Sequence, residues 1–362
     1  MRAGWHSWRV TQLRTVQVLG GGSAGSSAHV RSLAAGLVAR GVRVTVCAPA
    51  ELDQVYDFPG AGASFAPVPR RGDPAAVGAL RSVCASADLV HAHGLNAAVR
   101  SALALSGLRI PLVVTWHTRA QDEGARGRVL RLLERRAARA AAIVLGTCSE
   151  LVDRARKRGA RDARLAPLTV PAVLPRRAPA VGPVPAGRPL VLAVGPLTPD
   201  GGYGTLLDAA ALWRELDPVP LVVIAGEGRE RAALERRIAA EGLPVRLLGR
   251  REDVTALLTA TDIAVLPSRW EARSLLAQES LRLGVPLVAT AVGGVPELVG
   301  DGAELVPYGD GGALAVTVAE LLGNRSRRAE LARRGRAQAA GWQTEDETVA
   351  QVLSVYDELV SR

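Results

Sequence analysis

The stretch TVQVLGGGSAGSSAHVRSLAAGLVARGVRVTVCAP, residues 15–49, decides the fold class of this chain. It starts with a short apolar run (15–20) and is then broken by glycines and serines. Apolar residues at helical spacing follow, and a second apolar run (42–49) closes the stretch. Strand, turn, helix and strand in this order are typical of a βαβ unit. Uninterrupted valine- and leucine-rich strands indicate a parallel sheet that is covered on both faces.

The same alternation continues along the chain, in apolar runs at 88–94, 111–118, 141–149, 189–196, 220–228, 244–249, 262–268 and 286–294. A helix is expected from about Tyr203 to Leu216, and the proline-rich stretch 171–189 suits a linker. With 362 residues the chain is long enough for two domains. We expect an α/β protein of two doubly wound, Rossmann-like parallel-sheet domains facing a cleft. The predicted parts are an N-terminal acceptor-side domain at 1–172, a linker at 173–189, a second domain at 190–345 and a C-terminal helix at 346–362 that packs back on the body.

The formal charge of +10 suggests anionic partners, but an arginine-rich composition without functional meaning is the preferred explanation. No basic segment with interleaved aromatic residues indicates nucleic-acid binding. The three cysteines are isolated, which fits a reducing, cytoplasmic compartment. The first residues show no apolar signal-peptide core, and no apolar stretch reaches the length of a membrane span.

Ligands of open α/β sheets bind beyond the carboxyl ends of the strands. RWEARSLLAQES (269–280) follows an apolar run and begins a helical pattern. We expect Glu271 in the exit loop and Glu279 in the helix to accept hydrogen bonds from sugar hydroxyls. The backbone N–H groups of residues 273–276 would face phosphate. The alternative is a solvated helix with surface acids.

The block DIAVLPSRWEARSLLAQESLRLGVPLVATAVGGVPELVGDG (262–302) resembles the nucleotide-sugar-binding region of family 4 glycosyltransferases, which carry an E-x7-E motif. LGGGSAGSSAHV, ADLVHAHGLNAAV, LAVGPLTPDGGYGTLLDAAAL and VIAGEGRER resemble further segments of that family, in the same order and over nearly the whole chain. The resemblance implies a GT-B fold and a retaining hexose transfer from a nucleotide-diphosphate sugar to a hydroxyl acceptor. It implies no cofactor and no metal, and the sequence contains no D-x-D.

The resemblance also implies the site residues. Glu279 would hold the donor ribose and Glu271 the donor hexose, with His93 near the reacting sugar, so that His93 and Glu271 are the expected catalytic residues. The glycine-rich turn with Gly21, Gly22 and Gly25 would allow close approach of the backbone. The full set expected to bind the donor is Gly21, Gly22, Gly195, Glu227, Arg250, Arg273, Ser274, Leu275, Leu276 and Glu279.

The stretch GPLTPDGG (195–202) departs from the family pattern. Pro196 stands where the family has Arg, and Gly201 where it has Lys, the pair that neutralises the donor diphosphate. Arg273, Arg269 or Arg250 could supply the missing charge. Otherwise the donor is a different activated sugar, or the chain binds without turnover. The alternatives to a transferase are therefore a catalytically degenerate GT-B binding protein and a sugar-nucleotide epimerase.

Two further features leave alternatives open. His91 and His117 lie in or after strand-like runs, as His93 does, and each can be a site residue or a structural one. The arginine-rich helical stretch 126–142 has an apolar face, and it can dock on an anionic membrane or be an ordinary domain helix. The acceptor class, a lipid among the candidates, stays open, as does peripheral contact with the inner face of the membrane.

Overall fold

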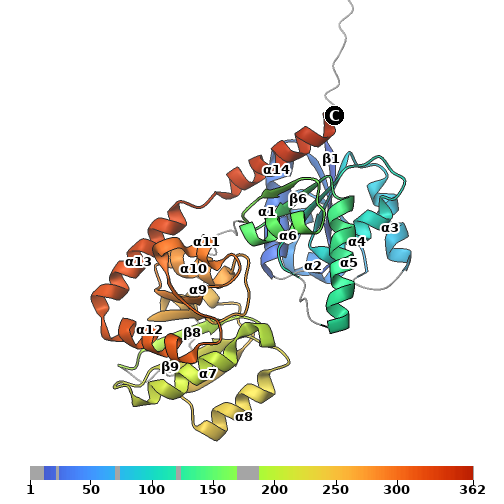
Figure 1. Cartoon of the computed structure of the whole chain (residues 1–362). Coiled ribbons are helices and arrows are strands. Elements are labelled where there is room, and N and C mark those ends of the chain that lie inside the picture. Colours follow the sequence, from blue (N-terminus) through green and yellow to red (C-terminus); the bar gives the residue numbers. More distant parts are fainter. Residues whose placement is uncertain (1–11, 22–23, 70–73, 120–123, 169–186, 362) are drawn as a thin grey trace, which may run out of the picture. The chain divides into compact units, whose positions relative to one another are not determined.

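The structure is a computed structural model that describes residues 12–21, 24–69, 74–119, 124–168 and 187–361. The chain forms two compact units (Figure 1): unit 1 comprises residues 1–171 and 343–362, and unit 2 comprises residues 172–342. Unit 2 is thus inserted in sequence before the last helix of unit 1. Residues 173–186 of the expected linker at 173–189 lie outside the described residues. Gly22 lies outside them as well.

Unit 1 contains a seven-stranded sheet in which every neighbouring pair is parallel, with the order β3-β2-β1-β4-β5-β6-β7. Its strands are β1 (Arg14–Leu19), β2 (Arg43–Ala48), β3 (Ser64–Pro67), β4 (Leu89–His93), β5 (Leu112–Trp116), β6 (Ile143–Gly146) and β7 (Ala163–Leu165). Its helices are α1 (Ala24–Ala39), α2 (Ala50–Tyr56), α3 (Pro74–Cys84), α4 (Leu95–Ala104), α5 (Gly124–Ala140), α6 (Ser149–Lys157) and α14 (Glu345–Val360), with a short 3₁₀ turn at Pro59–Ala61.

The strand order of unit 1 reverses between β1 and β4, so the connections leave this point in opposite directions. Such a switch point leaves a crevice at the carboxyl ends of its two strands, where ligands of α/β proteins bind. In the register of the pair, Gln17 lies opposite His91 and Leu19 opposite His93. His93 therefore ends its strand at the switch point.

The C-terminal helix α14 belongs to the core of unit 1. A capping box starts it: the hydroxyl of Thr344 accepts from the N–H of Glu347 at 3.1 Å, and the Glu347 carboxylate accepts from the N–H of Thr344 at 2.8 Å. Its apolar face enters the same buried cluster as α1 and the first strands, through Val349, Val352, Val355 and Tyr356. Helix α14 thus completes unit 1 after the chain has passed through unit 2.

Unit 2 contains a six-stranded parallel sheet with the order β10-β9-β8-β11-β12-β13 and a switch point between β8 and β11. Its strands are β8 (Leu190–Val194), β9 (Leu221–Ala225), β10 (Val245–Gly249), β11 (Ile263–Leu266), β12 (Leu287–Thr290) and β13 (Glu304–Val306). Its helices are α7 (Tyr203–Leu212), α8 (Arg231–Glu241), α9 (Val254–Thr259), α10 (Leu275–Leu283), α11 (Val295–Val299), α12 (Gly311–Gly323) and α13 (Arg325–Ala340), with 3₁₀ turns at Pro199–Gly201, Trp213–Glu215 and Gly300–Gly302.

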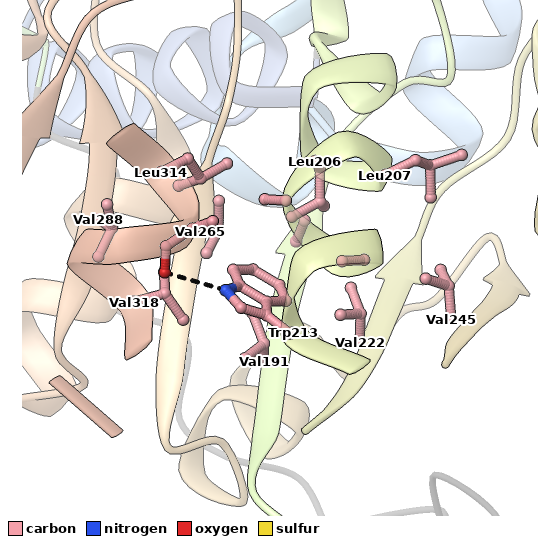
Figure 2. Packing of buried hydrophobic residues seen from close by; sticks show 14 of the residues in the cluster. Val191, Leu206, Leu207, Trp213, Val222, Val245, Val265, Val288, Leu314 and Val318 are labelled. Carbon is pink, nitrogen blue, oxygen red and sulfur yellow. Dashed lines mark hydrogen bonds between the residues drawn. The ribbon is translucent and has the colours of Figure 1, made fainter. Parts of the chain in front are cut away.

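Trp213 lies in the core of unit 2 (Figure 2), among valines and leucines of the sheet and of α7 and α12. Its indole Nε1 donates to the carbonyl oxygen of Ala315 at 3.0 Å, so the buried N–H is satisfied. The helix expected to reach Leu216 ends as an α-helix at Leu212, and a 3₁₀ turn carries the indole into the core.

Candidate functional site

Glu271 lies in the loop after β11, at the switch point of unit 2. Its backbone carbonyl accepts from the N–H of Gly294 at 2.8 Å, and the hydroxyl of Ser268 donates to its Oε1 at 3.3 Å. Gly293 passes so close that a β-carbon there would lie 2.1 Å from the Glu271 carbonyl oxygen, so only glycine fits. Burial raises the pKa of Glu271 to about 7, a shift that its bond to Ser268 opposes. The loop thus holds a carboxyl group that titrates near neutral pH.

Helix α10 begins directly after this loop. Ser274 is its N-cap, with the hydroxyl accepting from the N–H of Ala277 at 3.4 Å. The amides of Leu275 and Leu276 lie in the first turn and have no partner inside the helix. Such a terminus favours an anion. The side chain of Leu276 is buried in the core. We therefore expect these two leucines to contribute their backbone N–H groups to an anion site.

Glu279 lies in the second turn of α10 and is partly buried. The hydroxyl of Thr255, from α9, donates to its Oε2 at 3.3 Å. Burial raises the pKa of Glu279, while the bond to Thr255 and the charge of Arg282 act in the opposite direction. The E-x7-E pattern therefore places both acids on one loop–helix segment in partly desolvated positions, unlike the surface acids of the alternative prediction.

Gly195 and Glu227 follow β8 and β9 at the same edge of the sheet. The N–H of Gly195 donates to the carbonyl oxygen of Ala225 at 3.1 Å. The carboxylate of Glu227 is engaged by Arg231, with Nη1 2.8 Å from Oε1. Arg250 directly follows β10 and is exposed. These residues surround the carboxyl ends of the strands, where the sequence predicted a donor site.

The two positions that lack the expected cations differ in the space around them. Pro196 is exposed. At Gly201 a β-carbon would lie 2.5 Å from Cε2 of Tyr203, whose ring is buried. The hydroxyl of Tyr203 lies 2.9 Å from where a β-carbon of Gly195 would be. Burial raises the pKa of Tyr203, and the charge of Glu271 adds to this shift. Tyr203, which sequence reasoning missed, therefore borders the site.

The arginines proposed as replacements have distinct surroundings. The guanidinium carbon of Arg273 lies 5.9 Å from the ring centre of Trp342, and that of Arg282 lies 5.6 Å from it. The indole Nε1 of Trp342 donates to the Leu298 carbonyl at 3.1 Å, which fixes the ring. The backbone N–H of Arg269 donates to the Asp200 carbonyl at 2.8 Å.

Unit 1 has a pocket of about 290 Å³ at the carboxyl ends of β4 and β5, lined among others by Gly21, Ser26, His93, Asn96, Trp116 and His117. Three side chains of this lining carry buried polar atoms that lack hydrogen-bond partners among the described residues. These atoms are Nδ1 of His93, Nε1 of Trp116 and both ring nitrogens of His117. Unpartnered buried polar groups are costly, so a pocket that collects several of them suits a polar ligand.

Four histidines gather beside this pocket. The ring of His93 lies 4.2 Å from that of His91, 5.8 Å from His117 and 6.1 Å from His29. Burial lowers the pKa of His29 to about 4 and that of His117 to about 3. Burial, followed by repulsion from the other histidines, lowers the pKa values of His91 and His93 well below the usual range. All four rings are therefore neutral at pH 7.

A hydrogen-bond network supports the two strand histidines from behind. Gln17 Nε2 donates to the hydroxyl of Tyr356 at 3.0 Å, and that hydroxyl lies 2.6 Å from Nδ1 of His91. Nε2 of His91 lies 2.6 Å from the Thr115 hydroxyl, and Nε2 of His93 lies 3.0 Å from Oε1 of Gln17. The sequence analysis missed Gln17, Tyr356 and His29. A glutamine inside a buried apolar strand was the one available signal.

Other features of the described residues limit the choice of sites. No group of three or more His, Cys, Asp or Glu side chains in this part of the chain is arranged to hold a metal ion. None of the helices that the structure describes is both long and apolar enough to span a membrane. The candidate sites are the loop–helix segment of Glu271 and Glu279 in unit 2 and the His93 pocket in unit 1.

Comparison with known proteins gives the family. Residues 24–171 match the glycosyl transferase 4-like domain, and residues 176–338 match the glycosyl transferases of group 1. D-inositol 3-phosphate glycosyltransferase of Xylanimonas cellulosilytica is 31% identical over 309 residues, which cover 76% of this chain and 73% of that protein. The protein of the same name from Salinispora tropica is 31% identical over 312 residues, which cover 76% of this chain. The match spans 64% of the Salinispora tropica protein, less than two thirds of its length.

A solved structure gives the fold. The crystal structure of Anabaena HepE in complex with UDP-glucose matches with a TM-score of 0.81 at 21% identity, covering 95% of this chain and all of that chain. Together with the two parallel-sheet units, this likeness confirms the predicted GT-B fold. The chain belongs to the group 1 glycosyltransferase family, with a glycosyltransferase 4-like domain in its N-terminal half.

Proposed function

We propose that the protein is a retaining glycosyltransferase that moves a hexose from a nucleotide-diphosphate sugar to a hydroxyl acceptor. The observation that carries this proposal is the loop–helix segment of unit 2. There a partly buried carboxyl group, Glu271, precedes a helix N-terminus, and a second acid, Glu279, follows within the helix. Relatives that share the family are named as glycosyltransferases, which favours transfer over a silent binding protein or an epimerase.

In the proposed complex, Glu279 accepts hydrogen bonds from the ribose and Glu271 from the hexose. The first-turn amides of α10 face the diphosphate, with Gly195 giving the backbone close access. The similar structures in complex with UDP and UDP-glucose support a nucleotide-sugar donor. The acceptor hydroxyl attacks the anomeric carbon from the face that the leaving diphosphate vacates, which retains the configuration. We propose no metal ion and no cofactor, since the sequence has no D-x-D.

The leaving diphosphate needs positive charge, because electrostatic stabilisation of a developing anion is a major part of catalysis. We propose that Arg273 provides it, with Arg250 and Arg269 as further sources. Arg273 lies between the two acids in the sequence, and its guanidinium carbon lies 5.9 Å from the ring centre of Trp342. An arginine fork suits phosphate oxygens.

We propose that the acceptor binds in the pocket of unit 1. The unpartnered nitrogens of His93, Trp116 and His117 offer hydrogen bonds to a hydroxyl-rich molecule. The relatives from Salinispora and Xylanimonas act, by their names, on D-inositol 3-phosphate, a polyol, which agrees with such a lining.

Helix α5 supports peripheral contact with the anionic inner face of a membrane. Ala137 is buried, whereas Val129 and Leu132 are 56% and 62% exposed. Exposed arginines flank these two apolar side chains at Arg128, Arg135, Arg136 and Arg139. Protruding aliphatic residues among arginines match a lipid surface with negative head groups. The cysteines Cys47, Cys84 and Cys148 are buried and form no disulfide bond among the described residues, which agrees with a cytoplasmic location.

Membrane contact is tested by sedimentation with phosphatidylglycerol vesicles and with neutral phosphatidylcholine vesicles. We expect binding to the anionic vesicles only, lost in the double variant Val129→Asp/Leu132→Asp. Val316→Asp is the matched control, because Val316 is 59% exposed on α12 of unit 2. Equal sedimentation of all variants would contradict the proposed contact.

Donor use is tested with a panel of UDP-, GDP- and ADP-sugars, with released nucleoside diphosphate as the signal. We expect turnover with one nucleotide class and its loss in Glu279→Ala. Glu235→Ala, which removes a half-exposed carboxylate of the same unit, should keep full turnover. No release from any donor, combined with no thermal shift by any nucleotide, would contradict the proposed function.

A further inference from the structure

Of the two ring nitrogens of His93, which lines the unit 1 pocket, one has a hydrogen-bond partner in the protein and the other has none among the described residues. Nε2 of His93 lies 3.0 Å from Oε1 of Gln17. Nδ1 is buried, has no partner among the described residues, and belongs to a side chain that lines the pocket and is 4% exposed. Which of the two nitrogens carries the proton decides whether His93 offers the pocket a donor or an acceptor.

The network behind His93 answers this question. An amide oxygen can only accept, so the bond between Gln17 Oε1 and His93 requires the proton on Nε2. Since burial keeps the ring neutral, Nδ1 then carries a lone pair. The group that meets His93 in the pocket must therefore be a hydrogen-bond donor.

In the structure the amide nitrogen of Gln17 faces the last helix. Gln17 Nε2 donates to the hydroxyl of Tyr356, a side chain of α14 with 0% exposure. In this arrangement the hydroxyl proton is available for Nδ1 of His91, which lies 2.6 Å away. Nε2 of His91 is then protonated and donates to Thr115. In this network each hydrogen-bond donor meets an acceptor. The network ends at His93, where the lone pair lies on Nδ1.

We propose that Gln17 and Tyr356 are positioning residues that hold His93 as the Nε2-protonated tautomer, so that its Nδ1 accepts a hydrogen bond from a ligand hydroxyl in the unit 1 pocket. A carboxylate, a phosphate or a carbonyl oxygen does not fit this position, since each would face a lone pair. The ligand class depends on the proposed function, whereas the tautomer does not.

The donors of the pocket lie elsewhere on its wall. Nε1 of Trp116 can only donate, and neutral His117 has one donor and one acceptor nitrogen. A ring with several hydroxyls satisfies such a mixed lining, because each hydroxyl can both donate and accept. We therefore assign a polyol face to the ligand at His93.

The tautomer is read in the free protein by the nitrogen chemical shifts and long-range couplings of the histidine rings, with His93→Gln for assignment. We expect a protonated Nε2 and a bare Nδ1 for His93. In Gln17→Met and Tyr356→Phe we expect a mixture of tautomers. Val352→Ala is the control, because it weakens the same helix α14 without touching the network, and it should leave the His93 signals unchanged.

The kinetic test uses the same variants. We expect kcat to fall about 10- to 100-fold in Gln17→Met and Tyr356→Phe, as for other residues that orient a functional histidine. The donor KM should stay near that of the parent, and Val352→Ala should lower the melting temperature with little change in kcat. A protonated Nδ1 in the parent protein, or an unchanged tautomer in both variants, would overturn the proposal. A correct tautomer without any transferase activity would instead reject the proposed function and leave the positioning roles standing.

Discussion

A β-carbon at Gly201 would lie 2.5 Å from Cε2 of Tyr203 and 3.0 Å from the carbonyl oxygen of Pro196. The position where related enzymes are expected to have a lysine is therefore closed by a buried aromatic ring in this protein. A side chain at Gly201 would overlap the Tyr203 ring, so exchanging this glycine for lysine would require the turn after β8 to move.

Gly201→Lys should therefore fail to increase turnover and should destabilise the protein by about 1–3 kcal/mol, since the side chain overpacks the turn. Pro196→Arg is the matched variant, because Pro196 is exposed and a longer side chain there has room. Denaturant unfolding and initial rates measure both effects. A faster and equally stable Gly201→Lys protein would show that the ring of Tyr203 does not close this position.

Arg273→Ala and Arg282→Ala form a matched pair, because both arginines lie against the ring of Trp342. Each variant should lose a cation–π contact worth about 0.5–1 kcal/mol. If Arg273 neutralises the diphosphate, Arg273→Ala should in addition lower kcat about 100-fold. Steady-state kinetics with the preferred donor separate the loss of the cation–π contact from the loss of charge at the diphosphate. An Arg273→Ala rate equal to that of the parent protein would exclude Arg273 as the source of charge.

Glu271→Gln should raise stability while it removes turnover. The pKa of Glu271 is raised from 4.5 to about 7 in the folded state, so the folded protein binds more protons than the unfolded chain between these values. The free energy by which the Glu271 carboxylate destabilises the folded state therefore grows as the pH rises from 4.5 to 7, and it is constant above pH 7. We expect the variant to be more stable by about 2 kcal/mol at pH 8. This advantage should vanish near pH 4.5, as measured by denaturant unfolding at several pH values.

The histidine cluster should make unit 1 sensitive to acid. Burial lowers the folded-state pKa of His29 from 6.5 to about 4, so the unfolded state binds more protons in this range. Stability is fully present above pH 6.5 and falls as the pH drops, by about 1.4 kcal/mol per pH unit for each such histidine. His29→Phe keeps an aromatic ring beside His93 and His117. The variant lacks one of the groups that bind a proton on unfolding in acid. Its unfolding free energy should fall less steeply with acid, and an equal slope would contradict the assignment.

The sequence predicted the two-unit α/β fold well, because period and composition are local signals. Uninterrupted valine and leucine runs are typical of parallel strands, and glycine turns mark their carboxyl ends. The loop and helix that carry Glu271 and Glu279 were also predicted, since they are contiguous in the sequence. The roles of the two acids stay a prediction. The helix that ends at Leu212 was predicted too long, because tertiary packing of Trp213 interrupts it.

The network around His93 could not be predicted, because its members lie far apart in the sequence. Gln17 and Tyr356 are separated by 339 positions and meet only when α14 packs on the sheet. Nothing in the local sequence around Tyr356 distinguishes a tyrosine that bonds a strand glutamine from one that merely fills the core. Likewise, the obstruction of Gly201 by Tyr203 is a matter of ring placement, which residue spacing does not encode.

The insertion of unit 2 before α14 has a consequence for biosynthesis. As the nascent chain leaves the ribosome, residues 172–342 emerge as one uninterrupted segment and can fold at once. The core of unit 1 is complete only later, since its residues Val349, Val352, Val355 and Tyr356 are translated after unit 2. The bonds of Tyr356 to Gln17 and His91 therefore form only after the whole of unit 2 has been made.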